Sequence, residues 1–444
     1  MVTSHRLHKL SGLVAGIVLF ILALSGFVLD HDYWKPFYTI RFSTDSQVLL
    51  QKERRLITSK IVTDKAIYVA SMRGIYEKKG TTFAQTLALP TLALFANEEG
   101  IFAATSEGIY IRRENGWIPF ALEKEVVTAI SGDEEKLVAV VDKKELVVLD
   151  YDGHILHRSG VAIEKEKLVQ GIKLSRLLRD LHYGRGLFDN GISLVLNDYA
   201  ALVLLFLSSS GYLIWFLIRK KSTKKVKPLI KLHANILTLS ATVIMLLLAF
   251  SGIYLDHASF FGKYTKNIDV PRSLLPPVYN TLREDIWSVA LYENKFYIGN
   301  RVGVFASEDL ENWEKVSVGF GYSLSRVDEK LFIGGMGSPN RVCEAKNCKI
   351  IPDTPHMFKQ AFKTHEGISF LSSHAKDKSL PHFRDISLYT LMLSLHDGSF
   401  FASWWIWIND IAAVLLFVLI TTGSYRWWKK KRVFKWYGRT DKFS

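Results

Sequence analysis

Long apolar runs alternate with polar, strand-like stretches along this chain of 444 residues. Four runs, at about 10–29, 194–218, 234–255 and 406–425, could each cross about 30 Å of hydrocarbon, which takes roughly 20 helical residues. The pattern therefore predicts a membrane protein with four transmembrane helices. The first run exceeds the roughly 7–15 apolar residues of a signal peptide and no small-residue cleavage site follows it, so we expect a retained helix.

Short β-rich segments fill the two long stretches between these runs, at about 32–178 and 258–390. Apolar and polar residues alternate over four to six positions, with Gly, Asn and Asp between, as in "KAIYVASMRGIYEKKG" and "SVALYENKFYIGN". "GIYIRRENGW" and "GVFASEDLENW" resemble each other, and a spacing of about 30–45 residues suits propeller blades. Neither stretch holds enough repeats to close alone, so we expect both to join in one split β-propeller.

The apolar runs repeat in two halves. The first run ends on "SGFVLDH" (25–31) and the third on "SGIYLDH" (251–257), while the second and fourth runs share L-H-x-G, then N-D, then S/T-G. Two halves of equal orientation imply a pseudo-two-fold axis along the membrane normal. The predicted fold class is membrane α + β: four transmembrane helices in two parallel repeats forming a bundle, with a periplasmic β-rich domain from two long loops.

The basic residues indicate how the chain is oriented. Lys and Arg make the net charge +14 and gather near Arg6 and Lys9, in the loop 219–231 and in the tail 426–439. By the positive-inside rule these segments are cytoplasmic, which places both termini inside and both β-rich loops in the periplasm of a bacterium with the chain in its inner membrane. Contact with lipid headgroups explains this charge, so no nucleic-acid partner is expected.

These patterns give the expected organisation of the chain. In order, the segments are transmembrane helix 1 at 1–31, the first half of the β domain at 32–178, the L-H-x-G segment with helix 2 at 179–218, the basic cytoplasmic loop at 219–231, helix 3 at 232–257, the second half of the β domain at 258–390, the L-H-x-G segment with helix 4 at 391–428, and the basic cytoplasmic tail at 429–444.

The only two cysteines, Cys343 and Cys348, lie together in the second β-rich stretch. A loop outside the inner membrane of a bacterium lies in an oxidising compartment, so a local disulfide is expected. A free redox pair is the alternative. Their spacing does not match a four-ligand zinc site.

Histidines occupy matching places in the two halves, and a neutral imidazole is a common haem ligand. The matched pairs are His8 with His233, His31 with His257, and His182 with His396. A cofactor on the pseudo-two-fold axis would receive one histidine from each half, so we predict two b-type haems. His8 and His233 would bind the inner haem. The outer haem would take His182 with His396, His31 with His257, or a mixed pair drawn from these four. The alternative is that these histidines only cap helices or extend to the interface.

Small and polar residues accompany the histidines. Glycines on the helices would let a flat macrocycle or a neighbouring helix approach closely. They are Gly12, Gly16, Gly26, Gly211, Gly252 and Gly423. Asp198 and Asp410, in the N-D pairs at the starts of the second and fourth runs, could hold an imidazole N–H or simply form an interfacial turn.

The stretch "HRLHKLSGLVAGIVLFILALSGFVL", with "LHYG…ND…SGYLIWFLIRKK" and "LHDG…ND…TGSYRWWKKKR", resembles the PepSY-associated transmembrane proteins. This family includes bacterial inner-membrane reductases that release iron from ferric siderophores, with b-type haems between four helices. The resemblance implies ligand roles for His8, His182, His233 and His396, which match the L-H positions. It covers the four apolar runs only, and the β-rich loops show no PepSY module.

The predicted function is therefore electron transfer across the membrane to ferric iron or a ferric siderophore in the periplasm, in support of iron uptake. "GFGYSLS" and "GGMGSP" lack the G-x-G-x-x-G spacing of a dinucleotide site, so a quinol or a cytoplasmic reduced flavin is the expected electron donor. The alternative is a cofactor-free, membrane-anchored β-propeller that serves as a binding or scaffold protein. A transporter is less favoured, because the runs show no broken helices and carry no charges at mid-membrane.

Overall fold

A computed structural model describes residues 4–164, 167–168, 171–189, 191–280, 285–344, 347–364, 367–372 and 380–440. The last four positions of the predicted basic tail, 441–444, lie outside the described residues. The chain forms two compact units. The helical unit contains the residues up to Asp32, Leu177–Thr265 and those from Leu391 on, and the β unit contains Tyr33–Arg176 and Lys266–Thr390.

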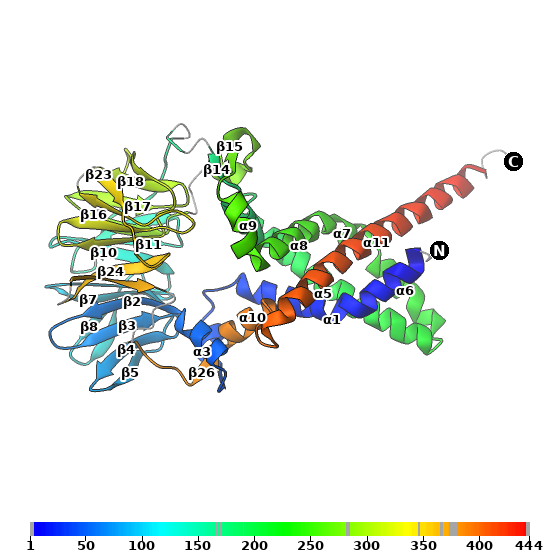
Figure 1. Ribbon diagram of the computed structural model, residues 1–444, viewed down its shortest axis with the longest axis horizontal. Coiled ribbons are helices and arrows are strands. Elements are labelled where there is room, and N and C mark those ends of the chain that lie inside the picture. The colour runs from blue at the N-terminus through cyan, green and yellow to red at the C-terminus, as the bar shows by residue number, and fades with distance from the viewer. Residues whose placement is uncertain are drawn as a thin grey trace. The chain divides into compact units, whose positions relative to one another are not determined.

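Among the described residues, four helices form the body of the helical unit (Figure 1): α1 (Ser4–Leu29), α5 (Ile192–Arg219), α8 (Thr242–Asp256) and α11 (Ile406–Thr440). Helix α1 packs against α5 and α11, and α8 packs against the same two helices. The remaining helices are short: α2 (Pro36–Thr39), α3 (Gln47–Arg54), α4 (Leu174–His182), α6 (Thr223–His233), α7 (Ile236–Ser240), α9 (Ala258–Thr265), α10 (Leu388–His396), and the 3-10 turns η1 (Arg272–Leu274), η2 (Pro277–Asn280) and η3 (Ser403–Trp405).

Within the described residues, three helical segments are long and apolar enough to cross a membrane: Ser4–Leu29, Ile192–Arg219 and Ser403–Lys429. The third apolar run differs from the expected straight helix. It belongs to a pair, Lys224–Ser240 and Thr242–Asp256, that bends by 71°, so the chain has four spans only if the bent pair counts as one.

Side-chain hydroxyls explain where the third run bends. Asn235 and Thr238 form a capping box at the start of α7, which only two residues separate from the end of α6. Ser240 Oγ donates to the Leu237 carbonyl at 2.8 Å, and Thr242 Oγ1 donates to the Leu239 carbonyl at 2.6 Å. Such local bonds compete with the helical hydrogen-bond ladder and bend helices. Hydropathy alone does not reveal these side-chain hydrogen bonds.

Small residues line the centre of the four-helix bundle. Its buried core contains Ala15 and Leu19 of α1, Ala200 of α5, Met245 of α8 and Ala412 of α11. Large apolar side chains on the same helices point away from this core and remain exposed, among them Val14, Phe20, Val195, Phe250 and Phe417. An exposed apolar surface around a bundle suits contact with lipid.

The β unit consists of small antiparallel sheets. Within the described residues, five of them have four strands each, joined in sequence order. They are β2–β5 (Ile57–Val62, Ile67–Ser71, Gly74–Lys79, Thr82–Leu87), β6–β9 (Thr91–Asn97, Gly100–Thr105, Gly108–Arg113, Gly116–Ala121), β10–β13 (Val127–Gly132, Leu137–Val141, Glu145–Leu149, Ile155–Gly160), β16–β19 (Ser288–Tyr292, Lys295–Gly299, Gly303–Ser307, Glu314–Val318) and β20–β23 (Ser323–Val327, Lys330–Gly334, Arg341–Glu344, Asn347–Ile350).

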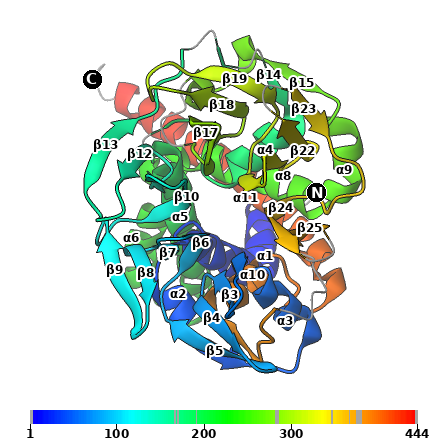
Figure 2. The same ribbon diagram turned by 90° about the vertical axis from the view of Figure 1, so that its left-hand side faces the viewer.

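Two-stranded sheets complete the unit: β24 with β25 (Phe358–Thr364, Gly367–Ser372), β1 with β26 (Arg41–Ser43, Asp385–Ser387) and β14 with β15 (Gly171–Lys173, Asp269–Pro271). The first strands of successive sheets lie against one another in the order β2, β6, β10, β16, β20, β24, and β24 also lies against β2. Figure 2 labels β6, β10 and β24 of this series. Both halves of the β-rich sequence therefore contribute to one unit.

In each four-stranded sheet the fourth strand has no buried position, whereas each of the other three strands contains buried positions. Strands β11, β16 and β18 are buried at every position, whereas β13 has no buried position. The expected alternation is therefore lost in the inner strands, because each sheet packs against a neighbour on both faces. The predicted matching segments occupy equivalent places, since β8 and β18 are both third strands that lead into the fourth strand of their sheets.

The structure joins Cys343 of β22 to Cys348 of β23 as a disulfide. The two residues face each other across a hairpin, and the described residues contain no free cysteine.

Candidate functional site

Four histidines of the helical unit share one arrangement. Each ring nitrogen Nδ1 lies within hydrogen-bond distance of a hydroxyl on a neighbouring helix. The pairs are His8 with Thr422 (2.9 Å), His182 with Ser251 (3.1 Å), His233 with Ser210 (2.7 Å) and His396 with Ser25 (3.0 Å). All four rings are half-buried.

The hydroxyl partners determine which nitrogen carries the proton. Ser25 Oγ donates to the Ile21 carbonyl at 2.6 Å, and Ser251 Oγ donates to the Leu247 carbonyl at 2.7 Å. Ser210 and Thr422 donate in the same way, four residues back along their own helices. A hydroxyl has one proton, so each one accepts from the Nδ1–H of its histidine. The Nε2 atom then keeps its lone pair, which is the form that binds a metal.

A glycine follows each hydroxyl residue and lies against the same ring. A Cβ atom added at Gly26 would stand 3.3 Å from His396 Cε1, and one added at Gly423 would stand 3.3 Å from His8 Cε1. The corresponding distances are 3.4 Å from Gly252 to His182 and 3.9 Å from Gly211 to His233. The Ser/Thr-Gly dipeptide thus supplies both an acceptor for the ring and the space that it occupies.

The histidines come together in two pairs. The ring centroids of His182 and His396 lie 6.0 Å apart, with the ring planes at 54°. His8 and His233 lie close enough to interact electrostatically. In the part of the chain that the structure describes, no protein group hydrogen-bonds to Nε2 of any of the four rings.

Burial keeps one of these pairs neutral. It lowers the pKa of His182, and the neighbouring His396 lowers that pKa further. Burial also lowers the pKa of His396. Both rings therefore stay uncharged at pH 7. The backbone next to them is fixed in matching ways, since Asn197 Nδ2 donates to the His182 carbonyl and Asn409 Nδ2 donates to the His396 carbonyl, each at 3.1 Å.

His31 and His257 have different surroundings. His257 Nε2 lies 2.7 Å from Asp410 Oδ2, and His31 Nε2 lies 3.7 Å from Asp198 Oδ2. His31 Nδ1 donates to the Phe27 carbonyl at 2.9 Å. The nitrogen that would face a metal therefore faces a carboxylate in both residues. The carboxylates of the N-D pairs hold this third pair of histidines, and their neighbours Asn197 and Asn409 hold the backbone of His182 and His396.

These residues fit a bis-histidine haem. Each pair offers two imidazoles with Nε2 unprotonated, one from each half of the repeat. Hydroxyls hold their other nitrogen, as the outer partners of metal-binding histidines commonly do. The small glycine surfaces leave room at the rings. The other two glycines expected to make room serve helix contacts, since Gly16 lies under the Tyr212 ring and Gly12 faces Leu419.

Sequence reasoning did not identify the hydroxyl residues Ser25, Ser210, Ser251 and Thr422 as partners. A signal was present, because a Ser-Gly or Thr-Gly dipeptide recurs in all four apolar runs. The partner of each dipeptide lies on another helix, however, and hydropathy and internal spacing do not reveal which helices meet.

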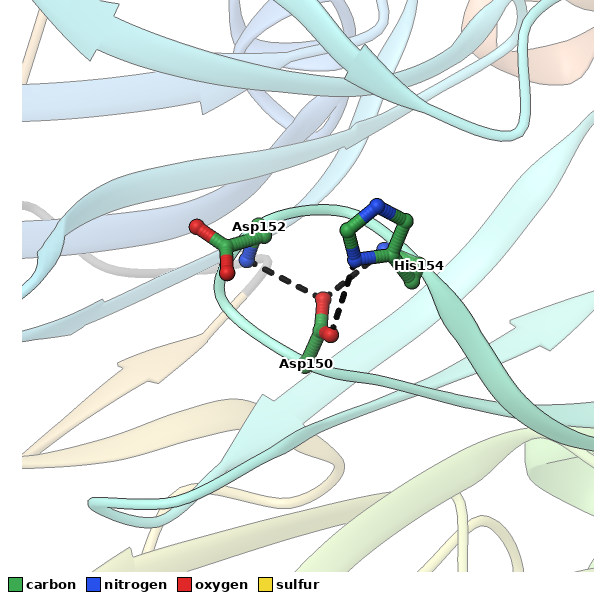
Figure 3. Close-up of side chains that lie close together, drawn as sticks. All are labelled: Asp150, Asp152 and His154. Atoms are coloured by element: carbon green, nitrogen blue, oxygen red, sulfur yellow. Dashed lines mark hydrogen bonds and ion pairs between the residues drawn. The ribbon is translucent and has the colours of Figure 1, made fainter.

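A separate group of possible metal ligands lies in the β12–β13 turn of the β unit. Figure 3 shows Asp150, Asp152 and His154, with the Asp150 carboxylate accepting from the backbone N–H of both other residues, at 3.0 and 2.8 Å, and lying 3.0 Å from His154 Nδ1. These bonds form a turn closed by its own side chain. The Asp152 and His154 side chains are exposed, and we assign the group no function.

Two solved structures show a distant likeness to this chain. The computationally designed Ika8 protein has a TM-score of 0.33 at 9% identity, with 71% of this chain and 80% of that chain covered. The extracellular domain of the putative one component system BT4673 from B. thetaiotaomicron has a TM-score of 0.31 at 8% identity, with 74% of this chain covered. The match covers 44% of that second chain, so this chain spans less than half of its length.

The comparison of sequence families is decisive. No curated protein matches the chain. The family described as the PepSY-associated TM region matches residues 5–430. The match begins before His8 and extends beyond Gly423, so it contains all four histidines and their Ser/Thr-Gly partners. This membrane protein belongs to the PepSY-associated TM family.

Proposed function

We propose that this protein is a di-haem b electron-transfer protein of the bacterial inner membrane that reduces ferric iron or a ferric siderophore on the periplasmic side. One observation carries the proposal: four histidines repeat a single arrangement, with Nδ1 held by a hydroxyl and the ring against a glycine. Helix caps or interfacial histidines have no need for this combination four times over.

The proposal assigns His182 and His396 to one haem, and His8 and His233 to the other. A bound haem supplies one-electron chemistry by changing between ferric and ferrous iron. The chain's own residues position the ligands: the hydroxyls fix the tautomer and make Nε2 more basic, and burial limits the access of water. His31 and His257 do not serve as ligands, because carboxylates face their Nε2 atoms.

The two sites are separated along the membrane normal. His8 and Ser25, the partner of His396, both lie on α1, and 17 residues of helix correspond to about 26 Å. This separation suits one centre near each face of a hydrocarbon layer of about 30 Å. Electrons would then cross the membrane in two shorter steps.

The orientation follows from charge. By the positive-inside rule, the exposed lysines of α6, with those just after α5, support a cytoplasmic location for this part of the chain. The bent pair of helices would then act as the third span. His8 and His233 then form the inner site, and the β unit lies in the periplasm. A quinol or a cytoplasmic reduced flavin would supply the electrons.

We further propose that the β unit is a split propeller with six blades. Supporting this are the six sheets whose first strands meet in sequence, with β24 against β2. The last of them has only two described strands, β24 and β25. The acceptor would bind on the side of the membrane that this unit occupies.

Proteoliposomes test the function. Vesicles that contain dithionite and carry the protein with its β unit outward should reduce ferric citrate outside, measured with a ferrous chelator that cannot cross the membrane. His8→Ala should stop this reduction, and His154→Ala, in the exposed β12–β13 turn, should not. A colourless protein that transfers no electrons would contradict the proposal and favour the cofactor-free binding or scaffold protein.

A further inference from the structure

Helix α6 ends on His233, one of the two proposed ligands of the inner haem. The segment Lys224–Ser240, which contains α6, is bent by 71° relative to α8, and α8 packs against α5 and α11 in the bundle. Helix α6 therefore runs across the bundle rather than along it, at the end that carries the N-terminus (Figure 1). A helix that crosses the end of a transmembrane bundle lies along the membrane surface.

One face of α6 contacts the rest of the helical unit. Val226, Leu229 and His233 stand three and four residues apart, so they share this face. Val226 is buried, and the other two residues are half-buried. The helix packs against α5, where Ser210 Oγ lies 2.7 Å from His233 Nδ1. The same face thus holds α6 to the bundle and carries the proposed haem ligand.

The opposite face of α6 carries a row of three exposed lysines, the lysine stripe: Lys224, Lys227 and Lys231. At about 100° per residue, their spacing places them roughly opposite His233. Within the described residues no carboxylate pairs with them, and no Asp or Glu occurs from 219 to 233. Lysines that served only to orient the chain in the membrane would need no such alignment.

Apolar side chains flank the lysine stripe, with Ile230 exposed on one side and Leu232 exposed on the other. Exposed lysines beside exposed apolar residues are typical of helices at the membrane interface, where ammonium groups meet anionic headgroups and apolar side chains enter the acyl layer. A free phosphate ion would leave Ile230 and Leu232 in water. The exposed apolar surface of the bundle continues beside them, which favours lipid over a soluble protein.

Helix α6 needs support on both faces. Its 11 residues are fewer than the roughly 12–15 that an isolated helix requires. Pro228 lies inside the helix and lacks the N–H that would donate to the Lys224 carbonyl. Contact with α5 on one face and with headgroups on the other would together fix the position of the helix. Because His233 is its last residue, a loss of support at the lysine stripe would reach the imidazole.

We propose that anionic phospholipid headgroups bind the lysine stripe of α6 and thereby hold His233 in place. The lipid binding goes beyond the electron-transfer function and does not require haem. Only the effect of the lipid on haem retention rests on the proposed function.

The full-length protein in nanodiscs tests the lipid binding. Spin-labelled phosphatidylglycerol should associate with the wild type in preference to spin-labelled phosphatidylcholine, and about 1 M NaCl should remove this preference. The stripe variant should lower the preference, because each lysine near an anionic surface contributes to the attraction. The control variant should not change it. The stripe variant carries Lys224→Gln, Lys227→Gln and Lys231→Gln, and the control carries Lys65→Gln, Lys79→Gln and Lys124→Gln at exposed positions of the β unit.

Transfer of haem to apomyoglobin tests the positioning of His233. In discs of phosphatidylcholine alone, the wild type should release one haem faster than in discs that contain phosphatidylglycerol. The stripe variant should release this haem at the faster rate in both lipids. His396→Ala keeps only the inner haem and should still show the lipid effect, whereas His8→Ala lacks the inner haem and should not.

A preference for phosphatidylglycerol that is equal in the stripe variant and the wild type overturns the lipid binding. So does the absence of any preference, as expected if the stripe receives a soluble acidic protein, or its removal by millimolar inorganic phosphate. Equal haem release in the two lipids overturns the positioning of His233. A haem-free protein that keeps the preference would contradict the proposed function and leave the lipid binding standing.

Discussion

The Nδ1 atom of His396 lies 3.0 Å from the hydroxyl of Ser25, which stands 371 positions earlier in the chain. The relationship is reciprocal, because His182 of the first half is held by Ser251 of the second. Every one of the four histidines is held by a hydroxyl from the opposite half of the repeat. Neither half could therefore position its own ligands alone.

Removing a hydroxyl should weaken the nearby haem without removing a ligand. In Ser25→Ala the His396 ring loses its acceptor, and losing such an outer partner costs about 10–100-fold in metal affinity. We expect haem to pass to apomyoglobin at least about tenfold faster from this site than in the wild type. Ser209→Ala is the matched control, since Ser209 bonds only its own helix and is exposed. Equal transfer rates in both variants would show that the hydroxyl has no role in ligation.

Filling the space beside a ring should displace that ring. A Cβ at Gly252 would already stand 3.4 Å from His182 Cε1, so the further methyl groups of Gly252→Val require the imidazole to move. We expect this variant to lose one of two haems, counted by pyridine haemochrome. Gly12→Ala introduces an ordinary contact of 3.6 Å with Leu419 and should keep both. A full haem content in Gly252→Val would refute the placement of the ring.

The choice of outer ligands can be tested directly. His396→Ala should lose one haem and keep the other, because His8 and His233 form a separate site. His31→Ala should keep both haems, since its Nε2 faces Asp198. Optical spectra of the two purified variants distinguish the alternatives, and loss of haem in His31→Ala alone would reverse the assignment.

Stability of the β unit should depend on its buried carboxylate. Glu53→Gln removes the buried negative charge beside the Arg73 guanidinium, which is then left with the partly exposed Asp385 carboxylate, and breaking buried ion pairs costs about 3–5 kcal/mol. We expect a loss of about 3 kcal/mol in the free energy of unfolding, measured by urea denaturation. The control Glu107→Gln removes an exposed pair with Lys35 and should cost less than about 1 kcal/mol. Similar midpoints for both variants would contradict a structural role for Glu53.

The sequence predicts some parts of this structure well because they follow from local patterns. The long apolar runs became α1, α5 and α11, and the turn-separated segments became four-stranded sheets. The bend before Thr242 was not predictable from hydropathy, because Asn235 and the hydroxyls of the same run redirect the backbone.

The candidate site, like the fold, is predictable from the sequence only in part. The internal repeat indicates which histidines are equivalent, such as His182 and His396. It does not indicate that His257 faces Asp410, because that contact joins residues 153 positions apart on different helices. Tertiary contacts of this kind depend on which helices pack together, and that information is spread over the whole chain.

The amount and type of haem bound by the purified protein test the central claim most directly. The account predicts two b-type haems per polypeptide by pyridine haemochrome, and a sharp low-spin α-band at about 560 nm after reduction, as expected for two histidine ligands per iron. A purified, folded protein without haem, or one with a high-spin spectrum, would contradict it.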